Sequence, residues 1–308
     1  MIRARVSYEV VGPIITSPEA GLVTNEPQFT VEGTASPTTT IELKQNGEDA
    51  GSVVVDENGK FSIETELTEG TNEFVAVSVL DDRVTGQSEP ATVILDTVKP
   101  VLTIENPING EKTNRETVTV QGTIADENLD FVHVNGQAAA VSNGKYSKRI
   151  LLNEGINEIV VEASDKAGNS ESKTVTVTAD YNAAEITNLK PENDLYLATG
   201  RSVKIEFDSD PGLKPSFVIH MPLTNVGQVN NATELPMMEQ GEGHYVGYWT
   251  VPADTVANGA VIEVKVVDEF ANETRQKAAG KLFINVPAPA GESEEAEVDV
   301  KEEVPVKD

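Results

Sequence analysis

Apolar and polar residues alternate over short stretches of this chain, and turn-forming residues separate the stretches. In one such stretch, Ile156, Ile159, Val161 and Ala163 are apolar and most of the residues between them are polar. This period of two is typical of a strand with one buried face. Residues 165–169, Asp-Lys-Ala-Gly-Asn, supply the polar and glycine side chains of a reversal, after which the alternation resumes. The pattern predicts a β-hairpin.

The chain contains an internal repeat. Residues 24–34 match residues 113–123 at an offset of 89, and residues 67–75 match residues 152–160 at an offset of 85. The second copy therefore has one loop that is four residues shorter, and the remainder stays in register. Two separate stretches that match in the same order, at offsets differing by one loop length, indicate duplication of a whole domain.

Each copy is predicted to hold seven short strands separated by turn residues, which is typical of an antiparallel β-sandwich. Pro18, Pro107 and Pro191 recur at offsets of 89 and 84, which predicts a third, more divergent copy. We therefore expect an all-β chain of three tandem sandwiches, over residues 10–97, 98–180 and 181–287. The first linker is short and ends in Pro100, which favours a stiff, elongated rod. In the third copy, residues 222–242 have few apolar pairs and are expected to replace a simple turn.

The two ends of the chain differ from the repeats. Residues 1–9 alternate as a strand, and we expect them to be the trailing strand of a preceding domain; the alternative is an edge strand of the first sandwich. Residues 288–308 carry eight acidic residues against two lysines. Such a composition buries too little apolar surface to offset the entropy of ordering, so we expect a disordered acidic tail.

The charge balance limits the classes of partner. The chain has 51 acidic and 23 basic side chains and a formal net charge of −28. Nucleic acids and anionic membrane surfaces both require clustered lysine and arginine, so we expect neither as a partner, and we expect a monomer. No apolar run is long enough for a transmembrane helix. The absence of cysteine excludes disulfides and thiolate metal sites.

One acidic stretch has the beginning of a calcium loop. Asp126, Asn128 and Asp130 have the oxygen spacing of its first three ligands. The pattern then fails, because Phe131 stands in place of the turn glycine and Gln137 in place of the bidentate glutamate. Solvated loop carboxylates are the simplest interpretation. The alternative is a looser calcium site built from Asp126, Asp165 and an acidic residue of a neighbouring domain.

Aromatic residues gather at one place in the third copy. Tyr245, Tyr248 and Trp249 lie in a single predicted strand, and Trp249 is the only tryptophan. Such a group could form a platform for a sugar or a peptide. The preferred interpretation is a sandwich core, because Tyr245 and Trp249 fall on one face of the strand and Tyr248 falls on the other.

No residue set indicates catalysis. Of the three histidines, His133, His220 and His244, the first two alternate with apolar neighbours in predicted strands. We expect them to face outward and not to converge into a triad or a metal site. The expectation for this segment is therefore no enzymatic activity, no catalytic residue and no cofactor other than the calcium alternative.

Several stretches resemble the C-terminal repeat region of secreted subtilisin-family serine endopeptidases of Gram-positive bacteria. The similarity covers nearly all of residues 1–287, and its most specific parts are residues 1–9, 221–225, 231–236, 247–250 and 272–275. More generally, the copies resemble bacterial Ig-like or fibronectin-III-like modules. The acidic tail departs from the pattern of these relatives.

The resemblance implies secretion to the cell exterior and a parent protease whose catalytic triad lies upstream in the same chain. It implies that this segment is a non-catalytic accessory or spacer region that presents loops to a protein substrate or a cell-wall polymer. A different class of function stays open, namely a cell-surface adhesion or carbohydrate-binding array with no protease attached. An exposed aromatic strip around Trp249 would favour that second class.

Overall fold

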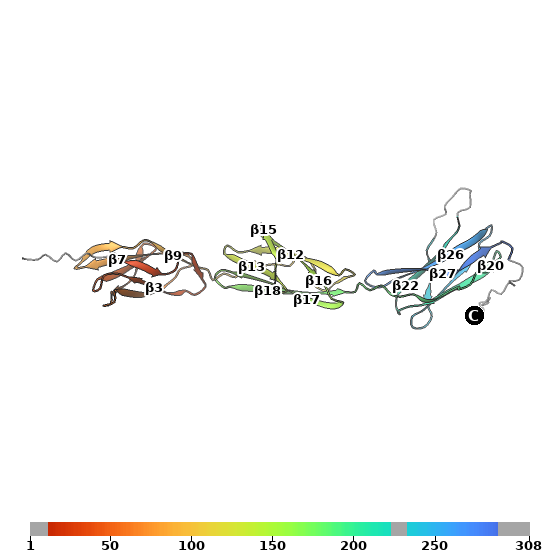
Figure 1. Cartoon of the computed structure of the whole chain (residues 1–308), viewed down its shortest axis with the longest axis horizontal. Coiled ribbons are helices and arrows are strands. Elements are labelled where there is room, and N and C mark those ends of the chain that lie inside the picture. The colour runs from red at the N-terminus through yellow and green to blue at the C-terminus, as the bar shows by residue number, and fades with distance from the viewer. Residues whose placement is uncertain (1–11, 223–232, 289–308) are drawn as a thin grey trace, which may run out of the picture. The chain divides into compact units, whose positions relative to one another are not determined.

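The structure of the protein is a computed structural model that describes residues 12–222 and 233–288. The chain divides into two compact units. The first contains residues up to 111 together with 117–151 and 158–177, and the second contains residues 112–116, 152–157 and 178 onward. The described residues form β strands in six sheets (Figure 1). No helix in this part of the chain is long and apolar enough to cross a membrane.

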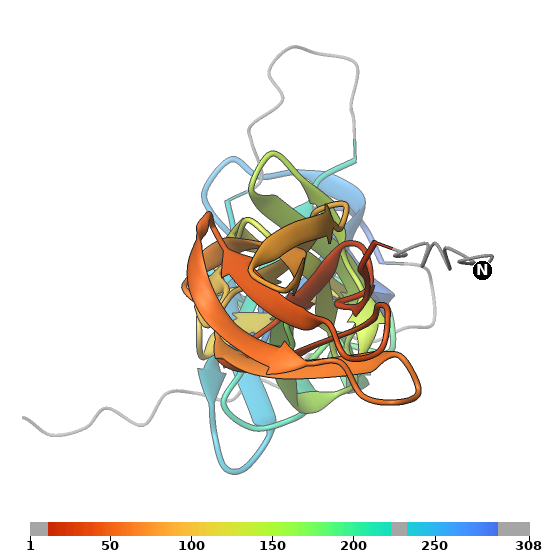
Figure 2. The same cartoon turned by 90° about the vertical axis from the view of Figure 1, so that its left-hand side faces the viewer.

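The first sandwich packs a small sheet against a larger one. Its core forms where alternate residues of both sheets meet, with Val31 and Phe61 on one side and Leu43 and Phe74 on the other, all less than 5% exposed. Figure 2 views this sandwich end-on, with its strands in red to orange. The small sheet contains β1 (Ile14–Ser17), β3 (Gln28–Thr34) and β6 (Lys60–Glu66), and the larger contains β2 (Leu22–Thr24), β9 (Ala91–Leu95), β7 (Gly70–Leu80), β4 (Thr40–Gln45) and β5 (Glu48–Val54), with β8 (Arg83–Gln87) paired to β7.

The second sandwich repeats this arrangement. Val120 and Tyr146 of one sheet and Val132 and Ile159 of the other are buried, as the alternation predicts. One sheet is formed by β10 (Val101–Leu102), β12 (Thr117–Ala125), β16 (Lys145–Leu151) and β15 (Ala140–Ser142). The other is formed by β11 (Glu111–Thr113), β18 (Ser170–Ala179), β17 (Gly155–Asp165), β13 (Leu129–Val134) and β14 (Gln137–Ala138).

The third sandwich has the same two-sheet plan. Its core includes Phe207 and Tyr245 from one sheet and Phe217 and Leu282 from the other. One sheet contains β19 (Thr187–Lys190), β21 (Ser202–Asp208), β25 (His244–Thr250) and β24 (Met238–Glu239). The other contains β20 (Leu195–Leu197), β27 (Glu273–Ile284), β26 (Ala257–Val267), β22 (Lys214–His220) and β23 (Leu235–Pro236).

A glycine opposite an aromatic ring marks the equivalence of the first two copies. Gly33 pairs with Phe61 in the first sandwich, and Gly122 pairs with Tyr146 in the second. A Cβ atom on Gly122 would lie 2.0 Å from the Thr103 carbonyl oxygen, so no other residue fits without a backbone shift. The pairing therefore confirms the predicted repeat in three dimensions.

The sheets differ from the expectation in one respect. Their strands are not all antiparallel, because β2 runs parallel to β9 and β20 runs parallel to β27. The chain passes from the first sheet to the second after β1 and again after β19, and this crossing brings the next strand alongside the last strand of the domain in the same direction. The period-two alternation shows which face of a single strand is buried, so it cannot tell whether the neighbouring strand runs parallel or antiparallel to it.

Three regions of the sequence prediction fall partly or wholly outside the described residues. These are the N-terminal strand over 1–9, part of the segment 222–242, and the tail apart from Ala288. Residues 233–242 are described, and they are not simply an irregular loop, because they contribute the short strands β23 and β24.

Candidate functional site

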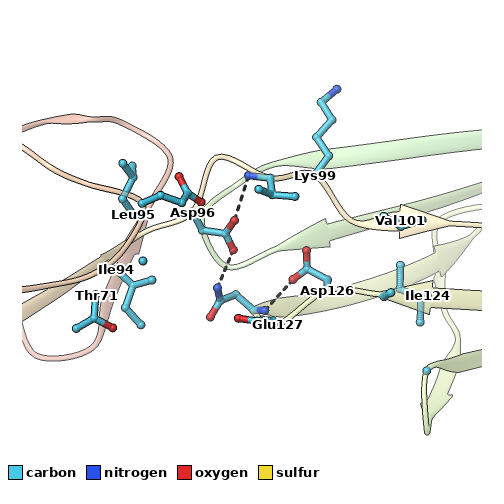
Figure 3. Close-up of a pocket in the computed structure, with 15 residues that line it drawn as sticks. Thr71, Ile94, Leu95, Asp96, Lys99, Val101, Ile124, Asp126 and Glu127 are labelled. Carbon is cyan, nitrogen blue, oxygen red and sulfur yellow. Dashed lines mark hydrogen bonds between the residues drawn. The ribbon is translucent and has the colours of Figure 1, made fainter.

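Three aspartates meet where the first sandwich is joined to the second, here called the first joint. Asp96 follows β9, Asp126 follows β12, and Asp165 is the last residue of β17. One carboxylate oxygen from each lies within 4.8 Å of the others. All three belong to the first compact unit, and Figure 3 shows Asp96 and Asp126 in the hollow that borders the joint.

The turn between β17 and β18 holds Asp165 in place. Asp165 Oδ1 accepts a hydrogen bond of 2.8 Å from the Asn169 backbone N–H, and Oδ2 accepts one of 2.7 Å from Asn169 Nδ2. Gly168 has a φ of 94°, which the tight turn requires and which other residues rarely adopt. The Asp-Lys-Ala-Gly-Asn sequence therefore fixes one carboxylate at this end of the sandwich.

Two further turns fix the other carboxylates. Asp126 Oδ1 accepts a hydrogen bond of 2.8 Å from the Asn128 backbone N–H, as an aspartate does when it opens a turn. Asp96 Oδ1 accepts one of 3.1 Å from Val98, and its Oδ2 accepts one of 2.7 Å from Asn128 Nδ2 (Figure 3). Asn128 thus connects the carboxylates that the two sandwiches contribute.

Burial without a cationic partner makes this group electrostatically unusual. Asp165 is 2% exposed and Asp96 is 8% exposed. Among residues 12–222 and 233–288, no lysine, arginine or histidine forms an ion pair with any of the three aspartates, and the Lys99 side chain points away from them (Figure 3). Close, buried carboxylates that lack a cation are costly to keep ionised.

The pKa of Asp126 reports this environment. Burial raises the pKa of the Asp126 carboxyl above its usual value, and the negative charges of Asp165 and Asp96 raise it further. The hydrogen bond from Asn128 acts in the opposite direction. A divalent cation would offset the repulsion, and calcium prefers carboxylate and amide oxygens. The chemistry of the three side chains is therefore compatible with calcium.

The structure separates the calcium candidates of the sequence. Asp126 and Asp165 meet, and the acid of the neighbouring domain that joins them is Asp96. The interpretation as solvated loop carboxylates is wrong for Asp165, which is buried. Asn128 turns its amide nitrogen toward Asp96, so it positions a carboxylate, and Asp130 is exposed on β13 outside the group. Sequence reasoning did not single out Asp96, although it stands at the start of the linker.

The second compact unit repeats part of this arrangement. Asn272 donates its backbone N–H to Asp268 Oδ1 and its Nδ2 to Asp268 Oδ2, each over 2.8 Å. The backbone N–H groups of Ile124 and Ser209 donate equivalent hydrogen bonds, which aligns these two residues. Two residues further on, the third sandwich has Pro211 where the second has Asp126. Within the described residues, a group of three potential metal-binding side chains occurs at the first joint and not here.

The aromatic candidates do not share a surface. Tyr245 is fully buried, and its hydroxyl donates to the Asp210 carbonyl over 2.8 Å and accepts from the Leu213 N–H over 2.9 Å. Trp249 is half-buried against the core of the third sandwich, and Tyr248 is 44% exposed. Tyr245 therefore belongs to the core and Trp249 packs partly against it, in agreement with the preferred core interpretation.

The histidines lie in three different strands. His133 stacks on Phe131 with ring centroids 4.2 Å apart. His220 lies 3.5 Å from Glu263, and His244 Nδ1 lies 2.7 Å from Asp208 Oδ1. No two histidines belong to one of the metal-type groups of the described residues.

The architecture defines a class of protein, namely a tandem array of Ig-like β-sandwiches. The sequence comparisons then identify the family: the chain belongs to the glucodextranase domain B family, whose profile matches residues 13–97 and 100–181. These two matches coincide with the first two sandwiches.

A curated relative matches most of the chain. Bacillopeptidase F of Bacillus subtilis (strain 168) is 46% identical over 286 residues. The match covers 92% of this chain but 20% of the relative, so the chain spans about a fifth of that protein's length. This similarity confirms the resemblance inferred from the sequence.

Two solved structures are among those that match the chain. An I-band fragment of titin has a TM-score of 0.48 at 11% identity, and it covers 91% of this chain and 100% of its own. The fibronectin(III)-like modules of Clostridium thermocellum CbhA have a TM-score of 0.36 at 20% identity, covering 55% of this chain and 94% of their own.

Proposed function

We propose that this chain is a non-catalytic spacer region of an extracellular subtilisin-like serine protease. The match to one fifth of bacillopeptidase F supports a location beside a catalytic domain in the same polypeptide. The repetition of one two-sheet plan along the chain supports a spacer role, because the copies differ from one another mainly at their turns and ends. Protein substrates and cell-wall polymers are the partners that such a spacer would face. The mass of the natural secreted protein, measured with antibodies against this segment, tests the attachment.

We propose further that the first joint binds calcium and that the ion stiffens the spacer there. The observation that carries this proposal is the meeting of Asp96, Asp126 and Asp165 with their oxygens within 4.8 Å. Asp96 comes from one sandwich and the other two come from the next. An ion bound by all three would therefore stabilise the joined form over the separated form.

Calorimetric unfolding in calcium and in EDTA tests the metal. At a calcium concentration one hundred times the dissociation constant, binding should add about 2.7 kcal/mol to the free energy of unfolding of the first unit. Asp126→Asn should abolish this gain. Glu127→Gln is the matched control, because it removes the same charge from an exposed neighbour outside the group. Unfolding that does not respond to calcium would refute the metal and leave the spacer role intact.

A gain-of-function variant sharpens the test. Pro211→Asp places a carboxylate at the third-sandwich position that corresponds to Asp126. If three carboxylates are what binds calcium, this variant should show a new calcium-dependent shift in the unfolding of the second unit. Wild-type protein should show no such shift in that unit.

The adhesion or carbohydrate-binding alternative lacks its expected surface. An exposed aromatic strip around Trp249 would favour that alternative, and the described structure has Tyr245 buried and Trp249 half-buried. Trp249 fluorescence in a titration with cell-wall glycan tests this alternative, and for a spacer the fluorescence should not respond. A response would move the third sandwich into the binding class.

A further inference from the structure

The same hairpin occurs at the start of the last strand in two sandwiches. Residues 165–169 read Asp-Lys-Ala-Gly-Asn and residues 268–272 read Asp-Glu-Phe-Ala-Asn. In each, the asparagine donates to the aspartate that opens the turn. We call this asparagine, together with the turn that holds it, the asparagine latch.

The first latch reaches the end of the preceding sandwich. Asn169 Nδ2 donates a second hydrogen bond of 2.8 Å to the Asp96 backbone carbonyl. Asn169 Oδ1 accepts one of 3.2 Å from Asn25 Nδ2, which lies just after β2. One amide of the second sandwich therefore contacts the first sandwich at two points, and neither contact uses a charged group.

The preceding sandwich holds the other side of the same linker peptide. Glu69 Oε1 accepts from the Thr97 backbone N–H over 3.2 Å, and Glu69 Oε2 accepts from the Thr97 hydroxyl over 3.0 Å. The peptide between Asp96 and Thr97 thus has its carbonyl bound by the following sandwich and its N–H bound by the preceding one.

The second latch uses the same atoms within the second unit. Asn272 Nδ2 donates over 2.8 Å to the carbonyl of Asp180, the residue that follows β18. Glu154 Oε1 accepts from the Tyr181 N–H over 3.2 Å. Glu69 and Glu154 are aligned residues of the repeat, as are the linker residues that they hold.

The first sandwich has no latch at its equivalent hairpin, and the closing residue of the third sandwich is held in a different way. The first sandwich has Leu80 where β17 ends in Asp165, and Val84 stands four residues later. At the end of the third sandwich, Asn285 donates its backbone N–H to Leu197 as Asp96 does to Thr24. Its side chain, however, binds Thr199 and Thr255 of the same sandwich.

We propose that the asparagine latch is the docking element between consecutive sandwiches, and that its partner is the main-chain peptide that closes the preceding sandwich. The latch binds a backbone carbonyl and not one of the carboxylates that would hold calcium, so it holds the linker whether or not a metal ion is bound. The inference is separate from the proposed calcium site, and it assigns a role to Asn169, Asn272, Glu69 and Glu154 that calcium binding does not require.

Hydrogen exchange of the two linkers in EDTA tests the latch. Asn169→Ala and Glu69→Ala act from opposite sides, and both should speed exchange at Thr97 roughly 5- to 30-fold, the factor that about one to two kcal/mol gives. Asn272→Ala and Glu154→Ala should do the same at Tyr181. Each pair of variants is the control for the other. The Asn169 and Glu69 variants should leave exchange at Tyr181 unchanged, and the other two variants should leave exchange at Thr97 unchanged.

Folding is monitored in the same experiment through amide exchange in the cores of β7 and β17. Preserved core protection with faster linker exchange is the expected result. Asn169→Leu keeps the approximate size of the side chain and adds no charge but removes its donors, so in EDTA it should match Asn169→Ala. Unchanged linker exchange in Asn169→Ala with an intact core would overturn the proposal, as would equal acceleration of both linkers by either pair.

Discussion

The first and second sandwiches share a scaffold but differ in the turns that follow equivalent strands. Buried strand residues and the glycine opposite an aromatic ring recur in both. At the aligned turn positions, Pro37 and Leu80 of the first sandwich are replaced by Asp126 and Asp165 in the second. The chemistry of the joint therefore resides in turn residues that the sandwich core does not need.

This difference lies in turns because turn residues are freer to vary than residues that face the core. A strand position that faces the core mostly takes apolar residues of similar volume, since interiors are closely packed. A turn at the end of a strand has no such restriction. Asp165 at the end of β17 orders a turn and contributes to the joint, whereas Leu80 at the end of β7 is 38% exposed and does neither.

Of the substitutions that compare the two sandwiches, replacement of Asp165 should change the free energy of unfolding most. Asp165→Ala deletes two hydrogen bonds at a site that is 2% exposed, and it leaves the Asn169 backbone N–H and one of the two Nδ2 hydrogens without their acceptors. We expect a loss of about 2–3 kcal/mol from the free energy of unfolding of the second sandwich. The aligned change Leu80→Ala should cost about 1 kcal/mol or less, because that side chain is already partly exposed. Urea unfolding in EDTA measures both, and equal losses would contradict the distinction.

Alkaline pH should separate the two sandwiches by a smaller amount. Burial raises the pKa of Tyr146 to about 12, while the first sandwich has Phe61 at that position. Because the folded state favours the neutral phenol, its contribution is complete below pH 10 and is lost as the pH rises toward about 12. Tyr146→Phe should remove this pH dependence from the second sandwich, at a cost of about 1 kcal/mol for the lost bond to the Thr103 carbonyl.

Thermal unfolding between pH 9 and pH 12 is the measurement, with ~0.5 unit steps across the titration range of tyrosine. The wild-type protein and Tyr146→Phe should converge at the highest pH. Parallel curves for the two proteins over the whole range would show that Tyr146 ionises without cost.

The smallest effect is expected at an exposed ion pair. Lys112 lies 2.7 Å from Glu269 and 5.3 Å from the centre of the Phe270 ring, while the first sandwich has Val23 at the aligned position. Both charged side chains are more than half exposed, so Lys112→Gln should cost about 1 kcal/mol or less, and high salt should reduce the difference. Glu269→Gln, which keeps the contact between Lys112 and Phe270, should cost less still. A loss that is independent of salt would contradict a screened surface interaction.

Much of the fold follows from the sequence. Period-two alternation identifies strands such as β7 and β17, and the repeated offset identifies equivalent domains, because strand burial and turn chemistry are local properties. The parallel pairing of β2 with β9 did not follow, since direction depends on where the chain crosses between sheets. Asp126 and Asp165 were identifiable as acidic turn residues in the same way.

What the sequence determined by itself is therefore the all-β class, the repeat and the polar residues at the turns. Only the tertiary structure decided which of those residues meet. Asp96, Asp126 and Asp165 are separated by 30 residues or more along the chain, and they converge because β9, β12 and β17 end at the same joint. Likewise, Asn169 is an ordinary turn residue in one dimension, and its contact with the Asp96 carbonyl exists because packing brings the next sandwich to that peptide. Long-range contacts of this kind depend on how strands are placed, which local periodicity does not encode.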